Sequence, residues 1–307
     1  MLDKIWASGK LRLVITGGCN ISCFYCHNEG QPKASTYLTE PLFERVLDLM
    51  HFEAPEVVTI TGGEPLLHPG IEHFVARLRQ YCQSVTMVSN CLLLTEARTS
   101  TLIAAGLTKF RIGVDSFSAA RSRPTSGTLP AVSIKDTVLQ LLSRGLAVEL
   151  NVVLTRFNEN EITAIVRFCG ERRISAKVFE HVEVLAYGDG KSLGQMQQKP
   201  IVRFDDFRSA VFGSGMIRSE STPTEYTGAN HVFFGDGFSV RYCRYLCPFG
   251  LCYKTGTRID PDGTAYACME KRGAMVLDLE EPIERAVEKL HAVVQVGCGR
   301  HNYVGKG

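Results

Sequence analysis

The chain has 307 residues, of which 45% are hydrophobic and 21% charged, and its formal net charge is +2. A chain of this size buries enough apolar surface to fold as one large domain or as one domain with an appendage. The small charge leaves no basic excess to attract nucleic acid or an anionic membrane, and the apolar runs are strand-sized. The first residues lack the pattern of an export signal. The sequence therefore predicts a cytoplasmic protein with no nucleic-acid or membrane partner.

Short strands rich in valine and isoleucine alternate with segments that carry apolar residues at helical spacing. The strands are predicted at residues 11–16, 56–60, 84–88, 109–113, 148–153 and 176–180. The helices between them are predicted at residues 41–51, 73–82, 95–105, 134–144 and 159–172. This order predicts an α/β fold with a parallel sheet, either open and doubly wound or a partial barrel. In both architectures the functional loops follow the strand ends.

The alternation of strands and helices breaks after about Tyr187. We therefore predict a first domain over residues 1–215 and a smaller C-terminal region over residues 216–307. Because cytosolic thiols stay reduced, the 11 cysteines are expected to be metal ligands or core residues rather than disulfides. Three isolated ones, Cys82, Cys91 and Cys169, are predicted to be buried in the core.

Three cysteines lie close together after the first predicted strand, in the stretch CNISCFYCHNEG. A 4Fe-4S cluster held only by Cys19, Cys23 and Cys26 would leave one iron open to an outside ligand. Zinc with His27 as the fourth ligand, or simple core packing, remains an alternative at this point.

The stretch TGGEP follows the second predicted strand and contains Gly62, Gly63 and Glu64. Its glycines would let a ligand approach the backbone, and its carboxylate could hold an amino group. Together with the cysteine stretch, it resembles the radical S-adenosylmethionine (SAM) superfamily over about residues 10–185. The resemblance implies a partial (β/α)6 TIM-like barrel with a 4Fe-4S cluster on the three cysteines and SAM on the open iron.

The same resemblance implies the chemistry and the residues around SAM. An electron from a donor such as flavodoxin or ferredoxin would cleave SAM, and the resulting 5′-deoxyadenosyl radical would take hydrogen from a substrate. The backbone of Tyr25 would lie against the adenine, and the Gly-Gly-Glu turn would receive the amino group of SAM. The contacts expected for the carboxylate or ribose are Ser89, Asn90, Asp115 and Ser116, with Asn151 as a further candidate. Taken singly, such residues are also common turn residues or helix caps.

Within the superfamily, the motifs resemble those of the GTP 3′,8-cyclases of molybdenum-cofactor biosynthesis. The stretches LRLVITGGCNISCFYCHNEG, TITGGEPLLHPGI, LAVELNVVLTRFNENEI and KVFEHVEV follow that family's order. The late stretch CRYLCPFGLCYKTGTRIDPDGTAYAC is similar to the family's auxiliary-cluster region, although its first spacing is longer and Cys298 adds a further thiol. The resemblance implies at least one auxiliary 4Fe-4S cluster, with ligands among Cys243, Cys247, Cys252 and Cys268. A zinc ribbon is the alternative.

The residues expected at the substrate carry little positive charge. A triphosphate needs several Lys or Arg partners, but only Arg12, Lys177 and Arg258 match basic positions of the cyclases. The other positions hold Val57, Thr59, His68, Glu149 and Gly256. We therefore predict a small, less charged substrate, such as a nucleoside or sugar nucleotide of secondary metabolism. The alternatives are the cyclase reaction itself, a peptide-modifying radical enzyme, and a metal-stabilised binding protein that is not an enzyme.

Overall fold

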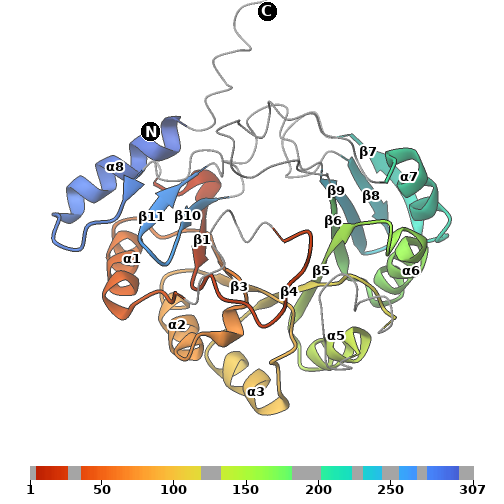
Figure 1. Ribbon diagram of the computed structural model, residues 1–307, viewed down its shortest axis with the longest axis horizontal. Coiled ribbons are helices and arrows are strands. Elements are labelled where there is room, and N and C mark those ends of the chain that lie inside the picture. Colours follow the sequence, from red (N-terminus) through yellow and green to blue (C-terminus); the bar gives the residue numbers. More distant parts are fainter. Residues whose placement is uncertain are drawn as a thin grey trace, which may run out of the picture. The chain divides into compact units, whose positions relative to one another are not determined.

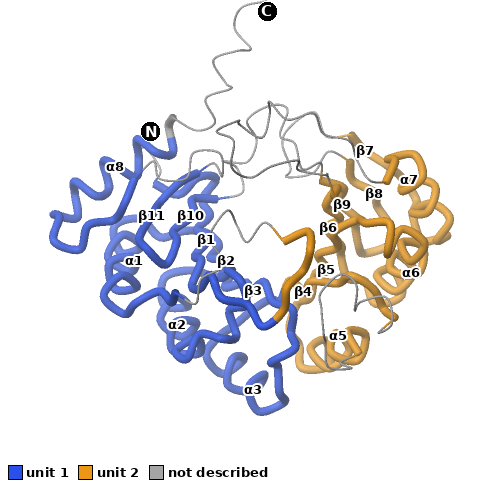
Figure 2. Tube along the Cα trace, viewed as in Figure 1, with its two compact units in different colours: residues 1–20, 27–110, 249–307 blue, residues 21–26, 111–248 orange. Residues whose placement is uncertain are grey.

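The computed structural model describes residues 5–26, 36–118, 133–181, 202–222, 231–243, 256–267 and 275–296. The chain forms two compact units (Figure 2). Unit 1 comprises residues 1–20, 27–110 and 249–307, and unit 2 comprises residues 21–26 and 111–248. The division therefore passes through the cysteine loop and through strand β4 (Lys109–Gly113).

Unit 1 is built on parallel strands that follow one another in sequence. Strands β1 (Lys10–Val14), β2 (Val57–Thr61) and β3 (Ser84–Ser89) are neighbours. Figure 1 shows the connecting helices α1 (Glu40–Phe52), α2 (Ile71–Leu78) and α3 (Glu96–Ala104) along one side of these strands. Strand β10 (Thr257–Ile259) pairs in parallel with β1, and β11 (Thr264–Tyr266) and β12 (Met275–Val276) continue from it in antiparallel fashion. Helix α8 (Ile283–Val296) completes the unit.

Alternating side chains explain why these segments are strands and which face they bury. Leu11 and Leu13 point to the same side of β1 and are fully buried. Phe43 of α1 and Phe74 of α2 stack with their ring centroids 3.9 Å apart. Each buried aromatic ring contributes about 1.5–3 kcal/mol through removal of apolar surface from water. The core therefore lies between the strands and the helices of the unit.

Unit 2 has the same plan. Strands β5 (Ala147–Leu154), β6 (Ser175–Glu180) and β9 (Phe238–Cys243) are parallel neighbours, and β8 (His231–Gly235) and β7 (Ile217–Ser221) follow in antiparallel fashion. The helices are α5 (Ile134–Ser143), α6 (Ile162–Arg172), with the short 3-10 turn η4 (Glu159–Glu161) before it, and α7 (Phe204–Phe212). Along β6 the buried Ala176 and Val178 alternate with the half-buried Lys177 and Phe179, so the sheet has one apolar and one mixed face.

All six predicted strands are confirmed, with ends that differ by at most two residues. The five predicted helices also form, but α2 ends at Leu78 rather than at residue 82, because the turn at Arg79 closes it. The C-terminal strands and helices were not predicted. Those strands do not form a sheet of their own: β9 joins unit 2 beside β6, and β10 joins unit 1 beside β1. The boundary at residue 216 stays a prediction.

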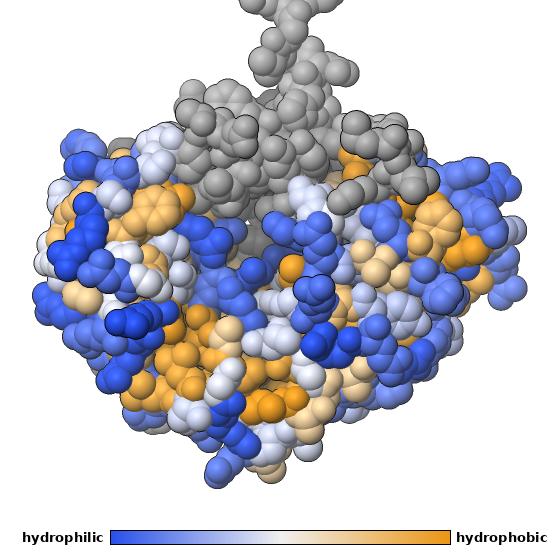
Figure 3. Space-filling view, turned by 180° about the vertical axis from the view of Figure 1, so that it is seen from behind, coloured by the Kyte–Doolittle hydropathy of each residue, from blue (hydrophilic) through white to orange (hydrophobic). Residues whose placement is uncertain are grey.

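The predicted burial of the three isolated cysteines is confirmed, since Cys82, Cys91 and Cys169 are all buried. Figure 3 shows mostly hydrophilic residues on the face seen from behind, with hydrophobic residues gathered in its lower middle. Among the helices that the structure describes, none is long and apolar enough to cross a membrane.

Candidate functional site

The residues that precede Cys19 and the Gly-Gly-Glu turn lie against each other in unit 1. The amide of Gly63 donates to the carbonyl of Thr16 at 2.8 Å, and the amide of Glu64 donates to the carbonyl of Gly18 at 2.8 Å. Both segments directly follow parallel strands, β1 and β2, so their loops meet at the same sheet edge. The first cysteine ligand candidate, Cys19, is therefore placed by backbone hydrogen bonds to the second motif.

The two glycines of the turn are required by this close approach. A Cβ atom on Gly62 would lie 2.3 Å from the carbonyl oxygen of Thr16, and Gly62 has a positive φ of 145°. A Cβ atom on Gly63 would lie 2.0 Å from the carbonyl oxygen of Gly18. No side chain fits at either distance, because the obstructing atoms belong to the backbone.

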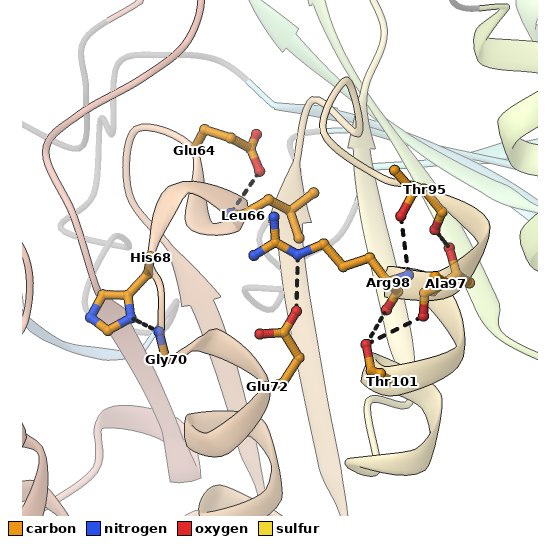
Figure 4. Close-up of polar contacts among 10 residues, drawn as sticks. Glu64, Leu66, His68, Gly70, Glu72, Thr95, Ala97, Arg98 and Thr101 are labelled. Carbon is orange, nitrogen blue, oxygen red and sulfur yellow. Dashed lines mark hydrogen bonds and ion pairs between the residues drawn. The ribbon is translucent and has the colours of Figure 1, made fainter.

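The carboxylate of Glu64 is fully buried and accepts three hydrogen bonds (Figure 4 shows the one from Leu66). The donors are the amide of Leu66 at 3.0 Å, the hydroxyl of Ser89 at 2.7 Å and the amide of Asn90 at 2.8 Å. Burial raises the pKa of Glu64, whereas these hydrogen bonds act to lower it. The side chain thus joins the ends of β2 and β3, and its predicted contact with SAM stays a prediction.

Asn90 connects the end of β3 to the cysteine loop. Its side-chain amide donates to Asn20 Oδ1 at 2.8 Å and lies 4.0 Å from the sulfur of Cys19. Its own Oδ1 accepts from the amide of Leu92 at 3.0 Å. The structure therefore brings together six predicted residues around one sheet edge, among them Asn90 and the exposed Cys19. The other four are Gly62, Gly63, Glu64 and Ser89.

Unit 2 holds the second part of the cysteine loop. The hydroxyl of Tyr25 donates to the carboxylate of Asp115, just after β4. Burial raises the pKa of Tyr25 well above its usual range, and the charges of Asp115 and Cys23 add to this effect. The amide of Cys26 donates to the carbonyl of Cys23 at 3.1 Å. This hydrogen bond closes a backbone turn between the two cysteines. The predicted Tyr25 and Asp115 are therefore direct neighbours.

The two remaining SAM candidates lie on unit 2. Ser116 donates to Glu161 Oε1 at 2.6 Å, and the amide of Phe117 donates to the other oxygen of the same carboxylate at 2.9 Å. Glu161, which the sequence analysis did not single out, thus fixes the turn after β4. The backbone carbonyl of Asn151 accepts from the amide of Val114, so the middle of β5 lies next to the end of β4.

The three thiols fit an iron-sulfur cluster by their chemistry, since thiolates are the usual protein ligands of such clusters. Cys19 and Cys26 are exposed and Cys23 is half-buried. In the part of the chain that the structure describes, no group of three His, Cys, Asp or Glu side chains is gathered as a metal site. Cys19 belongs to unit 1, whereas Cys23 and Cys26 belong to unit 2. The ligand assignment stays a prediction.

The auxiliary-cluster candidates are mostly outside the described residues. Cys247, Cys252 and Cys268 lie there, as do His27 and Cys298. Cys243 is described at the end of β9, where it is buried and packs with Val232 and Phe179. Burial raises the pKa of its thiol, and the positive charges of Lys177 and Arg241 act to lower it.

The three predicted substrate residues are divided between the two units. Arg12 on β1 and Arg258 on β10 are direct cross-strand partners in unit 1. Lys177 on β6 belongs to unit 2, where it is the cross-strand partner of Asn151 on one side and Arg241 on the other. Its ammonium group lies 4.9 Å from the ring centroid of Phe179.

The sequence analysis missed a buried ionic cluster in unit 2. Glu149 is only 1% exposed, and its Oε2 accepts from Arg111 Nε at 3.0 Å. Arg241 forms an ion pair with the other oxygen of Glu149. Burial lowers the pKa of both arginines. The sequence offered Arg111 and Glu149 on predicted strands, but their shared face and the third strand, β9, were not evident from it.

Comparison with known proteins agrees with this arrangement. The chain matches the Radical SAM superfamily over residues 13–169, just over half of its length. The chain therefore belongs to the radical SAM superfamily, whose members are enzymes that use a 4Fe-4S cluster and SAM. The predicted α/β fold of the partial-barrel type is confirmed by solved structures of such enzymes. SuiB of Streptococcus suis, solved with the precursor peptide SuiA, gives a TM-score of 0.62 at 14% identity over 96% of this chain and 66% of that chain.

The curated relatives include GTP 3′,8-cyclases. The probable GTP 3′,8-cyclase of Methanosarcina acetivorans is 34% identical over 291 residues, which cover 91% of this chain and 83% of that protein. The probable GTP 3′,8-cyclase of Pyrococcus horikoshii is 29% identical over 170 residues, or 53% of this chain. The matched part spans about half of the Pyrococcus protein, 52% of its length.

Proposed function

We propose that this radical SAM enzyme removes a hydrogen atom from a small molecule that carries less charge than a nucleoside triphosphate, such as a nucleoside or a sugar nucleotide. When bound, the cluster and SAM supply the 5′-deoxyadenosyl radical that performs the abstraction. The protein binds and orients the substrate. The observation that carries the proposal is Glu149, a buried carboxylate on β5 at a position where the resembling cyclases carry a basic residue.

Two other positions support the same conclusion. Both ring nitrogens of His68 contact the backbone of unit 1. Its Nε2 lies 3.0 Å from the carbonyl of Leu38. Its Nδ1 accepts from the amide of Gly70 at 3.0 Å (Figure 4). Thr59 on β2 is 5% exposed and carries no charge. Each charge-assisted contact to phosphate is worth about 1.5–3 kcal/mol, so several missing contacts would weaken triphosphate binding by orders of magnitude.

The cyclase reaction is the second candidate, because the curated relatives that cover most of the chain carry that name. Arg12 and Arg258 lie side by side on β1 and β10, as a phosphate site needs. A peptide substrate is supported by likeness of fold alone, as in the similarity to SuiB. We rank these two below the less charged substrate, on the grounds of Glu149 and His68.

The substrate proposal is tested by an anaerobic assay of 5′-deoxyadenosine formation with SAM and reductant. We expect stimulation by at least one member of a panel of nucleosides, nucleoside monophosphates and nucleoside uronic acids. We expect no stimulation and no cyclised product with GTP. Efficient turnover of GTP would contradict the substrate class and would leave the superfamily assignment unchanged.

We also propose that the C-terminal cysteines hold an auxiliary 4Fe-4S cluster independently of the first site. A variant with Cys19, Cys23 and Cys26 all replaced by Ala should then keep roughly half of the iron of the intact protein. The remaining iron should disappear when Cys247, Cys252 and Cys268 are replaced as well. Iron and zinc analysis of both variants provides the measurement, and stoichiometric zinc in the first variant would contradict an iron-sulfur cluster there.

A further inference from the structure

The side-chain amide of Asn90 is held in one orientation. Its Oδ1 accepts from the backbone amide of Leu92 at 3.0 Å. Because a backbone amide can only donate, the oxygen of the side chain lies on this side and the nitrogen on the other. Nδ2 donates to Asn20 Oδ1 at 2.8 Å and lies 4.0 Å from Cys19 Sγ. The two N–H groups of Asn90 therefore face the cysteine loop.

The backbone around Asn90 is fixed as well. Its own amide donates to one carboxylate oxygen of Glu64 at 2.8 Å. The hydroxyl of Ser89 donates to the other oxygen at 2.7 Å and accepts from the amide of Cys91 at 2.8 Å. Cys91 has a φ of 61°, a left-handed conformation that is uncommon outside glycine. Such a conformation persists where the surrounding contacts determine it, so the turn after β3 holds Asn90 in one place.

Asn20 completes a group of three polar side chains in unit 1. Its Oδ1 lies 3.9 Å from Cys19 Sγ and accepts from Asn90 Nδ2. A thiol can donate to this oxygen, but cysteine binds iron as the thiolate, which has no proton to donate. A side-chain amide carries two N–H groups. When Cys19 binds iron, the second N–H of Asn90 is therefore the donor that this group of three offers to the sulfur.

A hydrogen bond to a cluster sulfur acts differently on the two redox states. Reduction adds one negative charge to the cluster, and hydrogen bonds to charged acceptors are stronger than those to neutral ones. The donor therefore stabilises the reduced state more than the oxidised state, which raises the reduction potential. A higher potential makes it easier for an electron-donor protein to reduce the cluster.

We propose that Asn90 donates from Nδ2 to the thiolate of Cys19 and thereby raises the reduction potential of the cluster on the three cysteines. One electron from the donor protein enters the cluster, and no covalent bond of the protein forms or breaks. Asn20 is a positioning residue, because it accepts the other N–H and so directs the nitrogen toward the loop. The inference rests on the proposed ligand role of Cys19 and is independent of the substrate.

The first test compares Asn90→Asp with Asn20→Asp. Asn90→Asp keeps the acceptor for Leu92 and the shape of the side chain, but it removes the N–H donors and adds a charge. Asn20→Asp is the matched control, because it adds the same charge beside the same sulfur and keeps an acceptor for Asn90. Asn90→Asp should lower the equilibrium constant for reduction about 10-fold more than the control does, a difference of about 59 mV for one electron.

The potential is measured by an anaerobic redox titration of the reconstituted enzyme, followed by electron paramagnetic resonance. SAM should bind at the open iron of this cluster, so the signal that SAM perturbs in a parallel sample distinguishes it from an auxiliary cluster. Iron content and melting temperature of both variants show that each has folded and is loaded.

The second test detects the hydrogen bond itself. The enzyme is prepared with asparagine that carries 15N in the side-chain amide alone, and the reduced cluster is studied by pulsed electron paramagnetic resonance. The unaltered enzyme and Asn20→Asp should show a 15N coupling to the SAM-sensitive cluster. The coupling should be lost in Asn90→Asp.

The outcomes separate this inference from the ligand assignment. A SAM-sensitive signal with equal potentials in Asn90→Asp and Asn20→Asp, or with a 15N coupling that survives in Asn90→Asp, would overturn the role of Asn90 alone. Loaded, unaltered enzyme without any SAM-sensitive signal would contradict the ligand role of Cys19 and this inference together. A lower potential and a lost coupling confined to Asn90→Asp would support both.

Discussion

Replacing any one of Cys19, Cys23 and Cys26 by Ala is expected to reduce 5′-deoxyadenosine formation to background. The cluster expected here has only three protein ligands, so no remaining thiol of the loop can take the place of a lost one. The measurement is the anaerobic assay with SAM and reductant, together with iron and sulfide analysis. The same variants should fold, since Cys19 and Cys26 are exposed and Cys23 is only half-buried.

Cys169→Ala provides the control for these variants. Cys169 is fully buried in α6 of unit 2, far along the chain from the cysteine loop. Its replacement should cost about 1 kcal/mol of stability and should keep both the iron and the product. If the triple Ala variant still formed 5′-deoxyadenosine, the assignment of these cysteines would be wrong.

Gly63→Ala is expected to displace the cysteine loop and to abolish SAM cleavage. The new methyl group would start 2.0 Å from the carbonyl oxygen of Gly18, one residue before Cys19. Overpacking of this kind costs about 1–3 kcal/mol, and relief of the clash would break the hydrogen bond from Glu64 to Gly18. Denaturant unfolding of the protein and the 5′-deoxyadenosine assay measure the two effects.

Gly70→Ala tests whether the effect is specific to the turn. A Cβ atom on Gly70 meets the rings of His68, at 3.5 Å, and Phe74, at 3.9 Å, and both are ordinary contact distances. This variant should change the stability by less than about 0.5 kcal/mol and should keep its activity. Equal behaviour of Gly63→Ala and Gly70→Ala would show that the close approach at Gly63 does not matter.

The strands of the sheet could be predicted because each is a short run of branched apolar residues next to a helical pattern. β4 at residues 109–113 is predicted with both ends correct. The C-terminal strands β10 and β11 could not be predicted, because each is only three residues long. Pairing of β10 with β1 spans more than two hundred residues, and no local pattern indicates it.

The candidate site could be predicted only where one motif contains the residues. The ligand expected at the glycines of the turn stays a prediction, and the structure adds that the same glycines allow the carbonyls of Thr16 and Gly18 to approach closely. The cluster of Arg111, Glu149 and Arg241 could not be foreseen, since it depends on the register of strands that are far apart in sequence.

The pairing of β9 with β6 and of β10 with β1 limits how this protein can be engineered. Without the C-terminal segment, β1 and β6 would each present a row of unsatisfied amide and carbonyl groups, which favours association with other chains. A chimera that takes its C-terminal segment from a relative must therefore match the hydrogen-bonding register of both strands. A chimera whose C-terminal segment does not match this register is expected to aggregate rather than to act as an enzyme of altered specificity.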